Sequence, residues 1–232
     1  MDFRDRHIVV TGGTGALGSA LVGVLLEAGA VCHVPWMKER ELERFAHRSH
    51  AHIRLVEADL ADEAGVARLY DGAPRLWASI HIAGGFAMEA VAKTGKAALM
   101  AQVDMNFVSC FLCCGAAVRT MTKSGAGGRI VNVAARPGLE WRSGAGMAAY
   151  AASKAAVAAL TVALAEEVVK QGILVNAVAP SIIDTPANRE AMPKADHAAW
   201  PKVEEIARTI LFLASPDNRV TRGAVVPVYG SQ

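Results

Sequence analysis

The stretch Thr11-Gly12-Gly13-Thr14-Gly15-Ala16-Leu17-Gly18 decides the fold of this chain. It follows the apolar run 7–10 and opens residues 16–28, where apolar side chains recur at helical spacing. This pattern predicts a buried strand, a tight turn and a helix. In that setting the G-x-G-x-x-G spacing of Gly13, Gly15 and Gly18 lets the backbone approach a pyrophosphate at the helix N-terminus. The spacing alone also fits a turn that binds nothing; the flanking strand and helix favour nucleotide binding.

Strand and helix patterns alternate from this loop to the end of the chain. The predicted strands are residues 7–10, 31–34, 53–56, 77–82, 129–133, 173–179 and 224–228, and the predicted helices are residues 16–28, 39–47, 63–70, 98–121, 150–171 and 203–214. The strands read as continuous apolar runs, which is typical of a parallel sheet buried on both faces. No low-complexity linker divides the chain. We therefore predict one α/β domain over residues 1–232, a doubly wound parallel sheet (Rossmann fold) with helices on both faces.

The composition excludes several classes of protein. The 232 residues are 53% hydrophobic, which supplies a large core and excludes extended disorder. The net charge is only +2 and no long Lys/Arg run occurs, which argues against nucleic-acid and membrane partners. No run reaches the roughly 18 consecutive apolar residues of a membrane span. Three of the four cysteines share one apolar stretch, unlike a disulfide framework. We expect a reduced, cytoplasmic protein.

The second chemical feature is Tyr150-Ala151-Ala152-Ser153-Lys154. Residues four apart share a helix face, so the Lys154 ammonium can lie beside the Tyr150 phenol. The ordinary pKa of a tyrosine phenol is about 10, and a nearby cation lowers it by favouring the phenolate. Such a tyrosine can exchange a proton with a substrate oxygen while a nicotinamide moves hydride. Taken alone, the spacing also occurs by chance.

More segments lie in a matching order along the chain. Asp59-Leu60 follows the third strand, His81-Ile82-Ala83-Gly84 follows the fourth, Asn106 lies in the long helix, and residues 180–185 follow the sixth strand. Together with the glycine loop and the Tyr150/Lys154 pair, they resemble the short-chain dehydrogenase/reductase family over essentially the whole chain. The resemblance implies that Tyr150 is the acid/base, that Lys154 lowers its pKa and binds the nicotinamide ribose, and that Asn106 holds a water of the proton relay.

The cofactor-binding residues follow from the loop and from the resemblance together. The predicted set is Gly12, Gly13, Thr14, Gly15, Leu17, Gly18, Trp36, Lys38, Asp59, Leu60, Ala83, Gly84, Tyr150, Lys154, Pro180, Ile183 and Thr185. An acidic residue at the end of the second strand would favour NAD(H). Trp36 stands there instead and can stack on adenine, while Lys38 and Arg40 can meet a 2′-phosphate or be solvated. The preference is for NADP(H) over NAD(H).

The departures from the family pattern bear on the substrate. Ala135 occupies the place of the family's catalytic serine, and the loop before Tyr150 is about two residues longer, so Ser143 is either a replacement or, as we expect, an ordinary loop hydroxyl. Losing an oxyanion donor costs about 10²–10³ in rate, a penalty that a pre-polarised quinonoid or iminium substrate avoids in part. Dihydropteridine reductases of the family also lack the serine. His81 replaces an asparagine of the family motif and is expected to be a structural hydrogen-bonding group.

Other clusters have simpler interpretations. His47, His50 and His52 are not arranged with further ligands at metal spacing, and no metal site is predicted. The three clustered cysteines, Cys110, Cys113 and Cys114, are expected to be buried small apolar groups. Residues 186–201 form either a lid over the substrate or a surface loop.

The predicted function is hydride transfer between a nicotinamide cofactor and a carbonyl or alcohol, imine or quinonoid small molecule. One alternative is a quinonoid dihydropteridine reductase. Another is a cofactor-binding redox sensor or partner subunit with impaired catalysis, which only the missing serine supports. The family resemblance suggests a homodimer or homotetramer.

Overall fold

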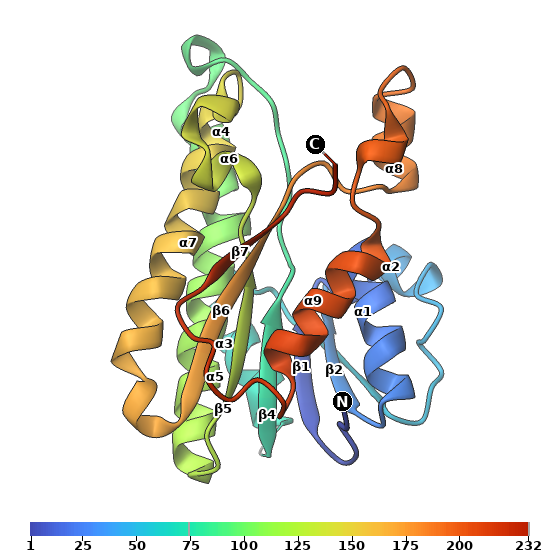
Figure 1. Cartoon of the computed structure of the whole chain (residues 1–232), viewed down its shortest axis with the longest axis vertical. Coiled ribbons are helices and arrows are strands. Elements are labelled where there is room, and N and C mark those ends of the chain that lie inside the picture. Colours follow the sequence, from blue (N-terminus) through green and yellow to red (C-terminus); the bar gives the residue numbers. More distant parts are fainter. Residues whose placement is uncertain (74, 232) are drawn as a thin grey trace.

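The computed structural model describes residues 1–73 and 75–231. In these residues the chain forms one seven-stranded parallel sheet with helices on both faces, as the alternating pattern predicts (Figure 1). Along the chain the strands are β1 (His7–Thr11), β2 (Val31–Trp36), β3 (Ile53–Glu57), β4 (Leu76–His81), β5 (Gly128–Val133), β6 (Ile173–Pro180) and β7 (Val225–Val228). All predicted strands are confirmed, with ends that differ by two residues at most.

The helices fall into long covering helices and short connecting turns. The longer ones are α1 (Ala16–Glu27), α3 (Glu63–Asp71), α4 (Lys96–Val103), α5 (Ser109–Ser124), α7 (Ala148–Glu167) and α9 (Val203–Ala214). The shorter ones are α2 (Glu39–Glu43), α6 (Arg136–Leu139), α8 (Pro186–Ala191), the π-helical turn η2 (Asp104–Val108) and the 3₁₀ turns η1 (Val91–Lys93), η3 (Trp141–Gly144), η4 (Val169–Gln171) and η5 (His197–Ala199).

The strand order places a crevice at one edge of the sheet. The order is β3-β2-β1-β4-β5-β6-β7, so the chain first winds outward from β1 to β3 and then crosses over to β4 and beyond. Val9 of β1 pairs with His33 on one side and with Ser79 on the other. In such sheets, ligands bind beyond the carboxyl ends of the strands where the winding direction reverses. Here that point lies between β1 and β4.

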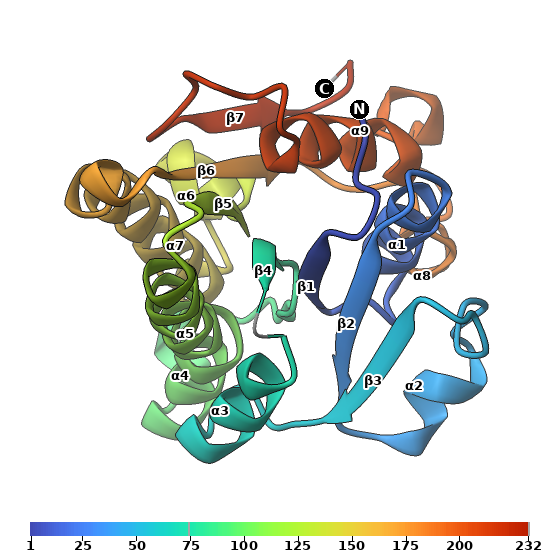
Figure 2. The ribbon, with the colours of Figure 1, turned by 90° about the horizontal axis from the view of Figure 1, so that it is seen from below.

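In the described residues, two apolar cores lie on the two faces of the sheet, under the helices that Figure 2 shows on either side of it. One joins α1 and α9 to the sheet through side chains such as Leu21, Leu25 and Ile210. The other joins α3, α5 and α7 through side chains such as Leu69, Met121 and Val157. Burial of this kind stabilises the fold by about 25 cal/mol per Å² of apolar surface, and it fixes the strand ends that carry the loops described below.

The predicted helix 98–121 lies within one helical stretch, Lys96–Ser124, that contains a π-helical turn. The structure divides it into α4, the π-helical turn η2 and α5, with Asn106 inside the turn. A π turn inserts one residue into a helix and is frequent at functional sites. The predicted helix 39–47 ends early, at Glu43, because the chain turns to bury Phe45 and to place the His47 ring against the Ser19 carbonyl, 3.2 Å away.

Within residues 1–73 and 75–231, two helical stretches, Lys96–Ser124 and Ala148–Glu167, are long and apolar enough to cross a membrane by length and composition alone. Both contain the helices that cover one face of the sheet, and their inward sides form its core. A core helix of a soluble protein passes the same test, so these stretches are weak evidence for a membrane.

Candidate active site

The glycine loop joins β1 to α1 in the way its sequence predicts. Gly12 has a positive φ of 66°, and a side chain there would lie 2.8 Å from the Ala83 backbone nitrogen. A side chain at Gly18 would overlap the Gly12 carbonyl, because α1 packs directly onto the loop. Gly15 is the N-cap of α1, so no side chain shields the first turn of the helix. Its backbone N–H groups can therefore receive a phosphate.

A cavity of about 510 Å³ opens beside this loop, beyond the carboxyl ends of β1, β2 and β4. Most of the predicted cofactor residues line it: Gly12, Thr14, Gly15, Leu17, Gly18, Trp36, Lys38, Asp59, Leu60, Ala83 and Gly84. Gly13, Tyr150, Lys154, Pro180, Ile183 and Thr185 are outside this lining. Gly13 faces inward, where a side chain would meet Val34. Arg40, Asp104, Met105 and Ser109 line the cavity without having been in the predicted set.

These residues fit a dinucleotide. The glycine loop and the start of α1 offer backbone donors, which suits a pyrophosphate. Trp36 and Leu60 offer apolar surface near the end of β2, and Lys38 and Arg40 add positive charge there. Glu41 also lines this end, with its carboxylate 3.5 Å from the Thr14 hydroxyl. The cavity therefore carries both charge signs where the adenosine end of a dinucleotide would lie.

The side chains of Asn106 and Lys154 meet at Gly84. The Asn106 amide forms two hydrogen bonds with Gly85, accepting from its N–H and donating to its carbonyl, both at 3.0 Å. A side chain at Gly84 would lie 2.5 Å from the Asn106 oxygen and 3.4 Å from Lys154 Nζ. Gly84 also lines the cavity. Residues from the loop after β4, from η2 and from α7 therefore converge at the edge of the nucleotide cavity.

The relation between Lys154 and Tyr150 differs from the prediction. Lys154 Nζ donates to the Val133 carbonyl at 2.9 Å, and burial lowers its pKa to about 8. Burial raises the pKa of Tyr150 to about 12, which is the direction opposite to the lowering predicted from Lys154. The physical reason is that the ammonium is directed to a backbone carbonyl of β5, while desolvation disfavours the phenolate. The Phe86 ring lies edge-on to Tyr150, with centroids 5.0 Å apart.

The loop after β5 contains no serine hydroxyl at the expected place. Ala135 is buried in extended conformation at the start of α6. Ser143 is exposed, and its hydroxyl donates to the Glu140 carbonyl of its own turn at 2.8 Å. The structure thus agrees with the expectation that Ser143 is an ordinary loop hydroxyl.

The segment after β6 has a local structural role in addition to the one implied by resemblance. Pro180 ends the strand, and the Thr185 hydroxyl accepts from Asn188 N–H at 3.2 Å as the N-cap of α8. Residues 186–201, which were predicted to form either a lid over the substrate or a surface loop, contain the helix α8 and the 3₁₀ turn η5. The pair Thr185-Pro186 is a helix-start signal that would have identified α8 from the sequence.

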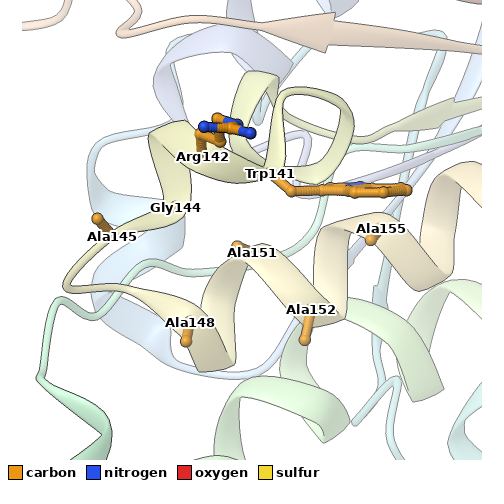
Figure 3. A pocket seen from close by; sticks show the side chains of 8 residues that line it. All are labelled: Trp141, Arg142, Gly144, Ala145, Ala148, Ala151, Ala152 and Ala155. Carbon is orange, nitrogen blue, oxygen red and sulfur yellow. The ribbon is translucent and has the colours of Figure 1, made fainter.

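A second groove, of about 490 Å³, lies between α7 and the η3 turn. It is lined by alanines at helical spacing and by residues of that turn (Figure 3): Trp141, Arg142, Gly144, Ala145, Ala148, Ala151, Ala152 and Ala155. The Trp141 ring extends over α7 near Ala155 (Figure 3) and is 77% exposed. Its lining shares no residue with the nucleotide cavity, so this groove is separate from the site above.

Comparison with known proteins gives consistent matches. The family model for short chain dehydrogenases matches residues 6–196. The chain is 33% identical to cis-4-hydroxycyclohexanecarboxylate dehydrogenase of Sinomonas cyclohexanicum, over 98% of this chain and 96% of that protein. It is 30% identical to (2S)-[(R)-hydroxy(phenyl)methyl]succinyl-CoA dehydrogenase subunit BbsD of Thauera aromatica, over 100% and 98%. A solved structure of a short chain dehydrogenase/reductase family protein gives a TM-score of 0.90 at 29% identity, covering 99% of this chain and 98% of that one.

Proposed function

This chain belongs to the short-chain dehydrogenase/reductase family, and we propose that Tyr150, Lys154 and Asn106 carry out its proton transfer on a carbonyl or alcohol, imine or quinonoid small molecule. As a member of the family, it is an NAD(P)-dependent oxidoreductase. The observation that carries the proposed roles is the convergence of Asn106 and Lys154 on Gly84, at the edge of the nucleotide cavity.

The cavity beside the glycine loop would hold the cofactor, whose nicotinamide would supply or accept the hydride. We assign to Tyr150 the proton for the substrate oxygen during reduction; its phenol, whose pKa burial raises to about 12, is protonated at neutral pH. We assign Lys154, a buried cation at the edge of the nucleotide cavity, to the nicotinamide ribose, as the family resemblance implies. Asn106 fixes the Gly85 backbone and so holds the loop after β4 against the site.

The test is Tyr150→Phe, which removes the proton and leaves the ring. We expect turnover to fall by about 10²–10⁴-fold, with cofactor binding unchanged. Tyr229→Phe is the matched control, because Tyr229 lies at the carboxyl end of the chain, with its ring 4.9 Å from the Arg136 guanidinium carbon. Turnover that is equal in the Tyr150→Phe variant and the wild type would remove the role proposed for Tyr150.

The substrate side of the site is apolar. Phe86 and Met88 are exposed beside the phenol and the following loop, at 61% and 65%. This surface suits a hydrophobic or ring-bearing substrate. Such a substrate is also consistent with the similar dehydrogenase named for cis-4-hydroxycyclohexanecarboxylate. The test offers the protein 4-oxocyclohexanecarboxylate, simple ketones and a quinonoid dihydropterin in turn. The loss of reduced-nicotinamide absorbance then shows which class of substrate is reduced.

The quinonoid alternative rests on one observation, Ala135 in the place of the serine. Turnover with the dihydropterin but not with ketones would favour a dihydropteridine reductase. Turnover with ketones would show that water or substrate replaces the hydroxyl. A protein that binds cofactor and reduces none of these compounds would favour the redox-sensor or partner-subunit alternative.

The cofactor preference, the oligomeric state and the location of the protein are proposed from the cavity lining, the exposed surface and the composition. Lys38 and Arg40 support NADP(H) over NAD(H), although Glu41 opposes them in part. The apolar groove under Trp141, with the exposed Leu99, Met100 and Phe111 on α4 and α5, supports a homodimer or homotetramer. The composition supports a cytoplasmic location.

A further inference from the structure

A cluster of four donor atoms is buried against the face of the sheet that α5 and α7 cover. His81 ends β4, Asn132 lies on the neighbouring strand β5, and Cys110 and Cys114 stand one helical turn apart on α5. All four residues are at most 5% exposed. The imidazole and the two sulfurs offer ligand atoms that lie within 4.8 Å of one another.

The distances approach those of a tetrahedral zinc site. Zn–S and Zn–N bonds of about 2.3 and 2.0 Å at tetrahedral angles place sulfur and nitrogen about 3.6 Å apart. His81 Nδ1 is 3.5 Å from Cys114 Sγ and 3.9 Å from Cys110 Sγ. Asn132 Oδ1 is 3.4 and 3.5 Å from the two sulfurs and 2.8 Å from Nδ1. The nitrogen–sulfur and oxygen–sulfur separations are thus close to tetrahedral values, and the Nδ1–Oδ1 pair would have to open for a cation to enter.

The groups that surround Asn132 Oδ1 outnumber the hydrogen bonds that this oxygen can accept. Asn132 Oδ1 has two lone pairs, yet the imidazole and both thiols lie against it. The amide cannot rotate to relieve this, because its Nδ2 donates to Thr161 Oγ1 at 2.9 Å, and that hydroxyl donates to the Val157 carbonyl. The oxygen is thus held toward the sulfurs.

The surroundings orient the imidazole as a metal-binding histidine is oriented. His81 Nε2 lies 2.8 Å from the Ser79 hydroxyl and 3.2 Å from the Tyr70 hydroxyl. Histidine ligands almost always use their second ring nitrogen in this way, which fixes the ring and its tautomer. The expectation that His81 is a structural hydrogen-bonding group is confirmed, and the same bonds leave Nδ1 facing the cysteines.

We propose that His81, Cys110 and Cys114, with Asn132 Oδ1 as the fourth ligand, bind one Zn²⁺. The charges fit a buried site: two thiolates neutralise the divalent cation, while the imidazole and the amide are neutral, so no net charge is buried. Binding releases the two thiol protons to solvent. The sequence alone does not predict this site, because residues 81, 110, 114 and 132 follow no ligand spacing and only the fold brings them together.

Cys113 provides the matched control on the same helix. It is as buried as its neighbours, but it is outside the cluster of ligand atoms and interacts with the Tyr70 hydroxyl instead. Replacing Cys110, Cys113 or Cys114 with serine therefore exchanges one buried thiol for a hydroxyl on the same helix in each case.

The test measures metal content directly. The untagged chain is expressed with zinc in the medium, and a second sample is unfolded with a chelator and refolded with Co²⁺, because a buried site must load as the chain folds. We expect about one zinc per chain and, with Co²⁺, a thiolate-to-metal charge-transfer band with visible bands of tetrahedral cobalt. Cys110→Ser and Cys114→Ser should retain less than about a tenth of the metal, and Cys113→Ser all of it.

Each alternative outcome overturns the proposal. The first is a wild type that folds but contains no zinc and shows no cobalt bands. The second is an equal metal content in all three serine variants. The third is a disulfide between Cys110 and Cys114 in protein purified in air. Circular dichroism identifies variants that fail to fold, and for these His81→Asn supplies the same comparison. Because metal content is read without turnover, failure here is independent of the roles proposed for Tyr150 and Lys154.

Discussion

Replacing Lys154 with methionine tests the electrostatics of the site. Methionine keeps an unbranched side chain of similar length and removes the charge. In the wild type, burial lowers the pKa of Lys154 from 10.5 to about 8, while the unfolded chain keeps the ordinary value. Above pH 8 the folded state therefore releases a proton that the unfolded state still holds. The stability that this lysine costs at pH 7 is regained as the pH rises through about 8 toward 10.5.

The size of the effect follows from these two pKa values. A tenfold change in an ionisation constant corresponds to about 1.4 kcal/mol, so the wild type should gain about 2 kcal/mol from this group between pH 7 and pH 9.5. The methionine variant lacks that gain. Its free energy of unfolding, relative to the wild type, should therefore fall by about 2 kcal/mol over the same range. Groups that titrate in both proteins cancel in the difference.

Urea unfolding of both proteins at pH 7, 8, 9 and 9.5 measures this difference. Lys170→Met is the control, because Lys170 is exposed after α7 and its removal should leave the pH dependence unchanged. Turnover of the Lys154 variant should be lost at every pH. If the difference between Lys154→Met and wild type stays flat from pH 7 to 9.5, the ammonium is not desolvated in the folded state and the reasoning fails.

Three further changes probe the site. Gly18→Ala forces a methyl group into the backbone of the glycine loop and should cost about 1–3 kcal/mol of unfolding free energy along with NADPH binding; a fully stable variant that binds normally would contradict the packing described. Ala135→Ser should raise ketone reduction by about 10²–10³-fold if the missing donor limits the reaction, and no change in steady-state rate would show that it does not. Removing the charges of Lys38 and Arg40 together should lower kcat/KM for NADPH by about 10–100-fold, the value of one charge-assisted contact, and leave NADH nearly unaffected. An equal loss with both cofactors would refute the assignment of the 2′-phosphate to this pair.

The fold was predictable because its signals are local and repeated. Apolar runs ended by Thr11 or by Gly84-Gly85 mark strand ends, and in a parallel sheet these ends must meet at one edge. The lining of the nucleotide cavity by Trp36 and Lys38 followed from that geometry.

What escaped prediction depends on contacts between distant residues. The direction of Lys154 toward Val133 and the raised pKa of Tyr150 arise from burial, which helical spacing does not reveal. Asp104 and Ser109 line the cavity because a π turn lies between α4 and α5, and no residue type marks such a turn. The polar surroundings of Cys110 require the partner strands β4 and β5.

The π turn makes this chain sensitive to length at one point. One extra residue in a helix rotates every later side chain by about 100° around the axis. Deleting one residue within Asp104–Val108 would restore an ordinary helix and leave its composition almost unchanged. The same deletion would turn Asn106 away from Gly85, or Cys110 and Cys114 away from His81, because both alignments depend on the inserted residue. An indel at this position, among homologues or in a library, therefore cannot keep both sites aligned with the sheet, whereas a substitution there can.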